Sequence, residues 1–242
     1  MSEPSYAPMP DDWERALVVV AHPDDLEYGG SGAVAAWTAA GRSVTYVLAT
    51  SGEAGIDTLD PAECGPLREA EQRAAAAAVG VDPETGVEFL GHPDGLLTYG
   101  LPLRRDIAAA IRRHRPQLVV TSNHRETWPG GFLNQADHVA VGAATIDAVR
   151  DAANRWLFRE VGEPWTGVRW IAVAGSPQST HAVDIGPVFD RAVASLEAHR
   201  AYLAALGGDM AEPEPFLRRV AEQAATRLPG ATLATTFELF AL

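Results

Sequence analysis

Short apolar runs rich in β-branched residues alternate along the chain with longer stretches that are often rich in alanine. The short runs predict buried strands at 16–21, 43–49, 87–90, 117–122 and 168–174, with a last strand or edge segment at 232–240. The longer stretches predict helices at 31–40, 66–79, 103–114, 136–158, 187–206 and 214–226. Regular alternation of strands and helices is typical of an α/β fold. We therefore expect a Rossmann-like, doubly wound, mostly parallel sheet with helices on both faces.

The length and composition fit a single domain. The chain has 242 residues, of which 47% are hydrophobic, enough for a sizeable core. We expect one domain over 1–242, with a core at about 14–175 and a helical extension at about 187–242. The formal net charge of −13 makes nucleic acid and anionic membranes poor electrostatic partners.

Cysteine usage and hydropathy suggest where the protein works. Cys64 is the single cysteine, which excludes an intramolecular disulfide and suits a reducing compartment. The first twelve residues contain no basic stretch followed by a long apolar one, and no run of 18 apolar residues exists. We therefore expect a cytoplasmic protein without a signal peptide or stable membrane association.

One dense polar cluster follows the first predicted strand. It places one imidazole and three carboxylates in the segment His22-Pro23-Asp24-Asp25-Leu26-Glu27. Ligands of open α/β sheets bind beyond the carboxyl ends of the strands, so we expect the active site there. If the chain turns at Pro23, His22 and Asp25 can converge on one metal ion, with Asp24 left as a base for its water. The alternative is that the two aspartates only cap the following helix.

A third metal ligand should come from another loop on the same edge of the sheet. These loops carry Glu53, His92 with Asp94, and the segment from His124 to His138. We choose His138, at the start of a predicted helix, although a histidine there can also be a solvated capping residue. Catalytic zinc usually has three protein ligands and one open position. The predicted cofactor is Zn²⁺.

The first cluster, followed by Gly29-Gly30, resembles the N-terminal motif of the PIG-L/LmbE-like zinc de-N-acetylases. This resemblance implies that His22, Asp25 and His138 bind zinc and that Asp24 is the general base. It also implies a hydrolase that removes an acetyl group from the amide nitrogen of an amino sugar or a sugar-bearing metabolite.

The second motif of this family is His-Pro-Asp-His, and here the chain departs from it. The corresponding residues are Gln135-Ala136-Asp137-His138, so only the last two match. The resemblance places Gln135 and Asp137 in the catalytic group. Gln135 can donate a hydrogen bond to an oxyanion but cannot transfer a proton near neutral pH. The general acid therefore stays open between Asp24 and His124.

The resemblance also suggests substrate-binding residues. Arg68 matches an Arg-x-x-Glu helix motif of the family, and Asp94 lies in a segment that resembles its sugar-binding loop. From the sequence alone, Arg68 can equally be a solvated helix charge and Asp94 a turn residue. Glu53, His124 and Trp128 complete the expected set, in loops on the same edge. The expected partner is a small N-acylated sugar or related metabolite, and self-association is left open.

Other functions fit parts of the sequence. Gly30-Ser31-Gly32-Ala33-Val34-Ala35 matches a dinucleotide-binding pattern with Glu53 at about the right distance. That loop should directly follow the strand, however, and the intervening carboxylates would repel a pyrophosphate. Gln135 motivates a second alternative, a metal-binding family member without deacetylase activity. A third is hydrolysis of another amide or a small ester by the same metal and water.

Overall fold

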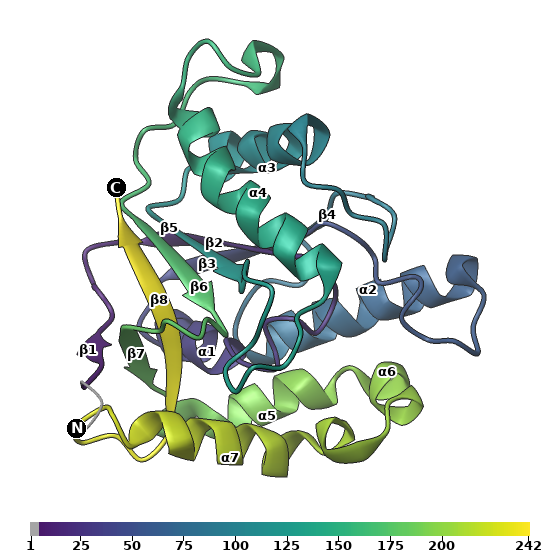
Figure 1. The fold of residues 1–242 in the computed structure, drawn as a ribbon, viewed down its shortest axis with the longest axis vertical. Coiled ribbons are helices and arrows are strands. Elements are labelled where there is room, and N and C mark those ends of the chain that lie inside the picture. The colour runs from purple at the N-terminus through teal and green to yellow at the C-terminus, as the bar shows by residue number, and fades with distance from the viewer. Residues whose placement is uncertain (1–4) are drawn as a thin grey trace.

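Eight strands form one sheet in the computed structural model, which describes residues 5–242 (Figure 1). In spatial order they are β1 (Ala7–Pro8), β7 (His181–Asp184), β8 (Ala234–Ala241), β6 (Trp170–Ala174), β5 (Leu118–Ser122), β2 (Arg15–Val20), β3 (Ser43–Leu48) and β4 (Val87–Phe89). Only β8 runs antiparallel to its neighbours, β6 and β7. The predicted mostly parallel sheet is confirmed.

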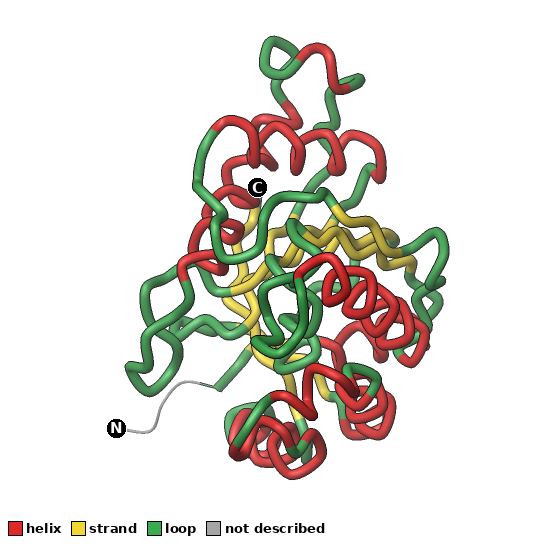
Figure 2. Tube along the Cα trace, turned by 90° about the vertical axis from the view of Figure 1, so that its right-hand side faces the viewer, coloured by secondary structure: helices red, strands yellow, loops and turns green. Residues whose placement is uncertain are grey.

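Helices cover both faces of the sheet, as Figure 2 shows. They are α1 (Ser31–Ala39), α2 (Pro61–Ala78), α3 (Leu101–His114), α4 (Ala136–Ala153), α5 (Phe189–Glu197), α6 (Arg200–Ala205) and α7 (Pro213–Ala225), with 3-10 turns η1 (Arg159–Val161), η2 (Gly186–Val188) and η3 (Gly208–Ala211). Side chains of a strand alternate between faces, so Val18 of β2 packs with α1 and α2 whereas Val19 packs with α3 and α4. Both faces of β2 are buried, which explains its uninterrupted apolar sequence.

The order of the strands creates a topological switch point between β2 and β5. The chain leaves β2 toward β3 on one side, and β5 pairs with β2 on the other. Connections from these two strands therefore diverge at their carboxyl ends and leave a crevice there. His22 directly follows β2, and the segment after β5 leads to α4, so both arrive at this crevice.

Helix α2 begins five residues earlier than predicted. Asp60 caps it by accepting a hydrogen bond from the Ala62 amide at 2.9 Å, and Pro61 occupies the first turn, where its missing N–H costs nothing. Pro66, predicted to start the helix, lies inside it. The prediction was wrong because a proline near a helix start was given more weight than the Asp-Pro cap before it.

Three boundaries in the second half also differ from prediction. The predicted helix 187–206 is divided into α5 and α6, with His199 fully buried at the break. The helix predicted to reach 158 ends at Ala153. The region 175–186, between the predicted strand 168–174 and the predicted helix 187–206, contains β7, which pairs with β8. These differences come from long-range packing, which local periodicity does not encode.

The C-terminal segment contributes to the same sheet as the N-terminal strands. After α7, β8 returns between β6 and β7 (Figure 1). Among residues 5–242, none of the helices combines the length and hydrophobicity needed to cross a bilayer. The expectation that the first twelve residues contain no signal peptide includes residues 1–4, which lie outside the described residues.

Candidate functional site

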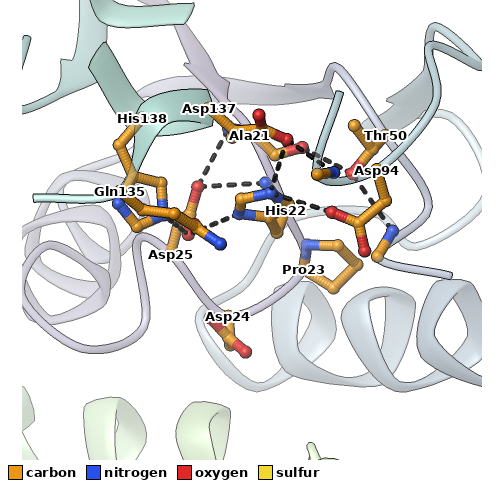
Figure 3. A network of polar contacts seen from close by, with 12 residues as sticks. Ala21, His22, Pro23, Asp24, Asp25, Thr50, Asp94, Gln135, Asp137 and His138 are labelled. Atoms are coloured by element: carbon orange, nitrogen blue, oxygen red, sulfur yellow. Dashed lines mark hydrogen bonds and ion pairs between the residues drawn. The ribbon is translucent and has the colours of Figure 1, made fainter. Parts of the chain in front are cut away.

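The turn after β2 orients Asp25. Its Oδ2 accepts hydrogen bonds from the backbone amides of Ala21 at 2.9 Å and His22 at 3.0 Å. These bonds fix the carboxylate at the end of the strand and leave Oδ1 pointing into the crevice (Figure 3). Pro23, which cannot continue strand pairing, comes directly after this point.

His22, Asp25 and His138 meet in the folded chain. Asp25 Oδ1 lies 2.9 Å from His138 Nε2 and 3.4 Å from His22 Nδ1. One potential ligand atom from each of the three side chains lies within 4.8 Å of the others (Figure 3). His138 arrives from the first turn of α4, 113 residues after Asp25. The structure thus brings together the three side chains that the sequence predicted as metal ligands.

The chemistry of these donors fits a divalent metal ion. Two imidazole nitrogens and one carboxylate oxygen are ordinary zinc ligands. Burial disfavours a charged His22, but the carboxylates of Asp25, Asp137 and Asp94 outweigh it and raise its pKa to about 12. Burial also opposes ionisation of Asp25, yet the two histidines hold the pKa of its carboxyl well below the ordinary value. A site this strongly negative favours a cation at its centre.

The second nitrogen of His22 faces two more carboxylates. Its Nε2 lies 3.0 Å from Asp94 Oδ1 and 3.3 Å from Asp137 Oδ2. One potential ligand atom from each of His22, Asp94 and Asp137 also lies within 4.8 Å of the others. However, Asp137 accepts backbone hydrogen bonds at both oxygens, from Gly95 at 2.8 Å and Leu97 at 3.1 Å. These engaged oxygens suit acceptors that orient the His22 ring rather than direct metal ligands.

Asp24 lies in the same crevice but turns away from the three ligands (Figure 3). Its φ of 86° is in the left-handed region, and Gln72 Oε1 accepts a hydrogen bond from its backbone amide at 3.1 Å. Its Oδ2 lies 2.6 Å from Arg68 Nη2. Burial raises the pKa of the Asp24 carboxyl well above the ordinary value, although the Arg68 cation opposes this rise. A buried carboxylate with a raised pKa is a typical general base.

Arg68 is directed toward protein atoms and is only 2% exposed. Besides Asp24, its guanidinium donates to the carbonyl of Pro23 at 2.6 Å and that of Gly52 at 3.1 Å. Its guanidinium carbon lies 4.2 Å from the centre of the Tyr202 ring. Arg68 lines the cavity, but most of its hydrogen-bonding capacity is already used.

Two residues just before His138, Asn134 and Gln135, contribute to the site. Asn134 Oδ1 lies 3.0 Å from His138 Nδ1 and also accepts from the Gln135 amide at 2.8 Å. Gln135 is exposed, and its side-chain amide extends toward Asp25 and His22 in Figure 3. Asn134 was not predicted from the sequence, although its position four residues before a histidine is a usable local signal.

The other predicted substrate-binding residues occupy different positions. Trp128 lines the cavity, with its ring 5.7 Å from that of His138. Glu53 supports the site from behind, since its Oε1 accepts a hydrogen bond from the Asp94 amide at 2.9 Å. His124 packs beside Gly142 of α4 and does not line the cavity. The substrate-binding roles of these residues stay predictions.

The three potential metal ligands line a cavity of about 420 Å³. Asp24, Asp94 and Gln135 line the same cavity. Tyr28, Tyr202 and Met210 add apolar surface. The Tyr28 hydroxyl donates to the Met210 carbonyl at 2.9 Å across a separation of 182 residues. No local pattern could have indicated these C-terminal contributions, because they depend on how η3 and α6 pack.

The glycine-containing loop offers no cradle for a pyrophosphate. Ser31 and Gly32 are buried at the start of α1. A Cβ on Gly32 would lie 2.9 Å from Ile185, so its close approach serves packing within the protein. The geometry gives no support to the dinucleotide-binding alternative.

The profile of the family described as "PIG-L: GlcNAc-PI de-N-acetylase" matches residues 17–149, which include all three potential metal ligands. The chain is 30% identical over 177 residues to a 1D-myo-inositol 2-acetamido-2-deoxy-alpha-D-glucopyranoside deacetylase of Rhodococcus erythropolis, covering 63% of this chain and 58% of that protein. It is also 30% identical over 142 residues to a probable N-acetyl-alpha-D-glucosaminyl L-malate deacetylase of Bacillus anthracis, covering 56% and 59%. The chain thus spans less than two thirds of the length of either relative.

The fold is shared with a solved structure over nearly the whole chain. The N,N'-diacetylchitobiose deacetylase of Pyrococcus horikoshii superposes with a TM-score of 0.82 at 23% identity, covering 95% of this chain and 85% of that one. This likeness covers more of the chain than the family match, which ends at residue 149.

Proposed function

The chain belongs to the PIG-L family, and we propose that it is a metal-dependent hydrolase that removes the acetyl group from the amide nitrogen of an N-acetylated amino sugar. One observation carries the proposal. His22 and Asp25, which follow β2, and His138, on α4, each have one potential ligand atom within 4.8 Å of the others, beside a cavity of about 420 Å³. A site of this kind, with room for water and substrate, suits hydrolysis of an amide.

Zinc is the metal that we propose for these three ligands, because two imidazoles, one carboxylate and an open position are typical of catalytic zinc. When bound, the ion supplies Lewis-acid chemistry that lowers the pKa of water and polarises the acetamide carbonyl. Asp94 and Asp137 hold the opposite nitrogen of His22, and Asn134 holds that of His138. These contacts keep the ligating nitrogens directed toward the centre of the site.

Asp24 acts in this proposal as the general base. It takes a proton from water as the water oxygen bonds to the acetamide carbon, and it returns that proton to the nitrogen as the carbon–nitrogen bond breaks. The products are acetate and a free amine. Burial gives the Asp24 carboxylate a higher proton affinity than an exposed aspartate has. Asp24 is preferred to His124 as the acid because Asp24 lines the cavity.

Gln135 is proposed to donate a hydrogen bond to the oxyanion, since its amide is exposed at the cavity and extends toward the ligands (Figure 3). Asp137 contributes by orienting His22. We propose that Asp94 and Trp128 contact the sugar from the cavity wall. Arg68 acts mainly by holding Asp24.

A de-N-acetylation assay tests the proposal. The protein, loaded with one equivalent of zinc, is incubated with N,N'-diacetylchitobiose and with the N-acetylglucosaminyl inositol glycoside, and acetate and free amine are measured. An amine-reactive dye is suitable because the sequence contains no lysine and gives little background. Equal release of acetate and amine is expected.

Two variants serve as matched controls. His138→Ala should abolish zinc-dependent turnover, whereas His181→Ala, on β7 and outside the group of potential ligands, should retain it. Unchanged turnover in His138→Ala would refute the proposed site. Stoichiometric zinc without turnover of any acylated amine would instead support the alternative of a family member without activity.

A further inference from the structure

The charged side chains around the cavity are unbalanced. Asp24, Asp25 and Asp94 line it, and Arg68 is the one arginine among its lining residues. The sequence has no lysine, so arginine is the only permanently cationic side chain available. Outside the three proposed metal ligands, the lining therefore has two carboxylates, Asp24 and Asp94, and one cationic side chain, Arg68.

Arg68 is poorly placed to bind an anion. Its Nη2 donates to Asp24 and to the Pro23 carbonyl, both at 2.6 Å, and its Nη1 donates to the Gly52 carbonyl at 3.1 Å. The Tyr202 ring covers the guanidinium at 4.2 Å. A carboxylate or phosphate of a ligand would have to displace these partners and leave Asp24 buried and unpaired, which is costly.

The backbone donors of the cavity wall are also occupied. The Ala54 amide donates to Asp94 Oδ2 at 2.8 Å, the Gly55 amide to the Gly52 carbonyl at 3.0 Å, and the Gly95 amide to Asp137 Oδ2 at 2.8 Å. Free backbone amides are what usually forms an anion-binding nest. At these three lining residues, each backbone amide already donates to an oxygen of the protein, so it is not free to bind an anion.

The groups that remain suit uncharged ligands. The Gln135 amide and the hydroxyls of Ser122 and Tyr202 are neutral, and Asp94 is an acceptor. Aromatic surface comes from Trp128 and Tyr28. Hydroxyl groups of a sugar or polyol can use such donors, acceptors and aromatic faces, whereas an acidic group beyond the metal ligands meets Asp24 and Asp94 and an arginine that is already engaged.

We propose that this site selects N-acetylated glycosides in which the group linked to the amino sugar is uncharged, and disfavours those in which it carries a carboxylate or phosphate. This inference rests on the proposed function and adds the charge class of the substrate. Discrimination arises from repulsion by Asp24 and Asp94 and from the lack of an unengaged cationic side chain among the lining residues, so it should weaken when salt screens the charges.

Three matched substrates test the inference: the N-acetylglucosaminyl glycoside of malate, the dimethyl ester of the same compound, and the methyl glycoside. The first two share a skeleton and differ mainly in charge. The diester should have a kcat/KM at least about 10-fold higher than the diacid at low salt, and the ratio should fall in about 0.5 M salt. Equal or faster turnover of the diacid would overturn the inference.

A binding measurement separates this inference from the proposed function. The deacetylated malate glycoside and its diester need no turnover, so calorimetry reports their affinities directly. Binding of the diester at least about 10-fold tighter supports the charge selection even for a protein without activity. Equal affinity for the two ligands refutes the charge selection. If none of the three substrates is deacetylated but the diester still binds more tightly than the diacid, only the catalytic proposal is refuted.

A charge-adding variant gives a control within the chain. Ala54 is exposed and lines the cavity, so a longer side chain can be placed there without disturbing the core. Ala54→Arg should narrow the difference between diester and diacid severalfold, whereas Ala54→Gln, of similar length but uncharged, should leave it unchanged. The same narrowing in both variants would show that size rather than charge controls selection.

Discussion

Asn134 Oδ1 lies 3.0 Å from Nδ1 of His138. The amide nitrogen of Asn134 is itself fixed, because it donates to the carbonyl oxygens of Asn123 at 2.7 Å and Arg125 at 2.9 Å. Asn134 thus connects a proposed metal ligand on α4 to the segment that follows β5. With the proton on Nδ1, the carboxamide oxygen accepts it, and the lone pair of His138 Nε2 is available to a metal ion shared with Asp25, whose Oδ1 lies 2.9 Å away.

Asn134→Ala should therefore weaken metal binding. Loss of a partner that orients a ligating histidine typically costs about 10–100-fold in metal affinity. Competition with a chromogenic zinc chelator measures this change. Asn154→Ala, at the exposed C-terminal end of α4, is the matched control and should bind zinc like the unmodified protein. Equal affinities of the two variants would show that Asn134 does not orient His138.

Asp24→Asn should separate catalysis from metal binding. The change removes the proposed base, so we expect kcat to fall by about 10²–10⁴-fold. Zinc content should stay at one equivalent, because Asp24 is not among the three potential ligands. Steady-state kinetics together with metal analysis provide the measurement. Turnover close to that of the unmodified protein would remove Asp24 from the mechanism.

Gly175→Ala should disturb the wall formed by Trp128. Gly175 has a φ of 67°, and an added Cβ would lie 2.3 Å from Trp128 Cζ3. We expect a loss of about 1–3 kcal/mol in the free energy of unfolding from strain, with a higher KM if Trp128 contacts substrate. Thermal and denaturant unfolding report the first effect and kinetics the second.

Gly175→Ala in a Trp128→Ala background shows how much of the loss in stability comes from the clash between the added Cβ and the indole ring. Without the indole ring, only the backbone strain of the left-handed conformation remains, so the loss in stability should be smaller. An equal loss in both backgrounds would contradict a contact between positions 175 and 128.

His199 should make the protein sensitive to acid. It is fully buried, and burial, assisted by the nearby Arg68 cation, lowers its pKa from 6.5 to about 3. Between these values the unfolded chain binds a proton that native His199 does not, so the free energy of unfolding decreases as pH falls from 6.5 toward 3. His199 lowers the free energy of unfolding by at most about 1.4 kcal/mol for each pH unit in this interval, and it adds no pH dependence above pH 6.5.

His199→Leu provides the comparison. Denaturant unfolding of both proteins at several values between pH 4 and pH 7 should show the difference in stability moving in favour of the variant as pH falls. Glu27, whose pKa burial raises to about 7, is present in both proteins. Parallel stability curves would contradict a neutral buried His199.

The sequence predicted those parts of the fold that local patterns determine. The β-branched runs of β2 and β5 are buried on both faces, so they stand out from their surroundings. β7 was missed because its four residues acquire strand character only by pairing with β8. The division of helix 187–206 has no local marker either, since neither Gly nor Pro occurs at His199.

The same distinction applies to the site. His22, Asp25 and His138 were predicted because parallel strands place their following loops at one edge, where short motifs converge. The engagement of Arg68 by Asp24 could not be predicted, since it depends on the orientation of α2 relative to the turn after β2. Contributions of Tyr202 and Met210 to the cavity likewise require the packing of the C-terminal helices.

Anomalous diffraction at the zinc edge, from crystals of the zinc-loaded protein, tests the central claim most directly. The account predicts one strong peak at about 2.0–2.2 Å from a ring nitrogen of His22, from Asp25 and from Nε2 of His138, with an open position toward the cavity. A peak held instead by Asp94 and Asp137, or no peak near His138, would contradict the proposed metal centre and the hydrolase built around it.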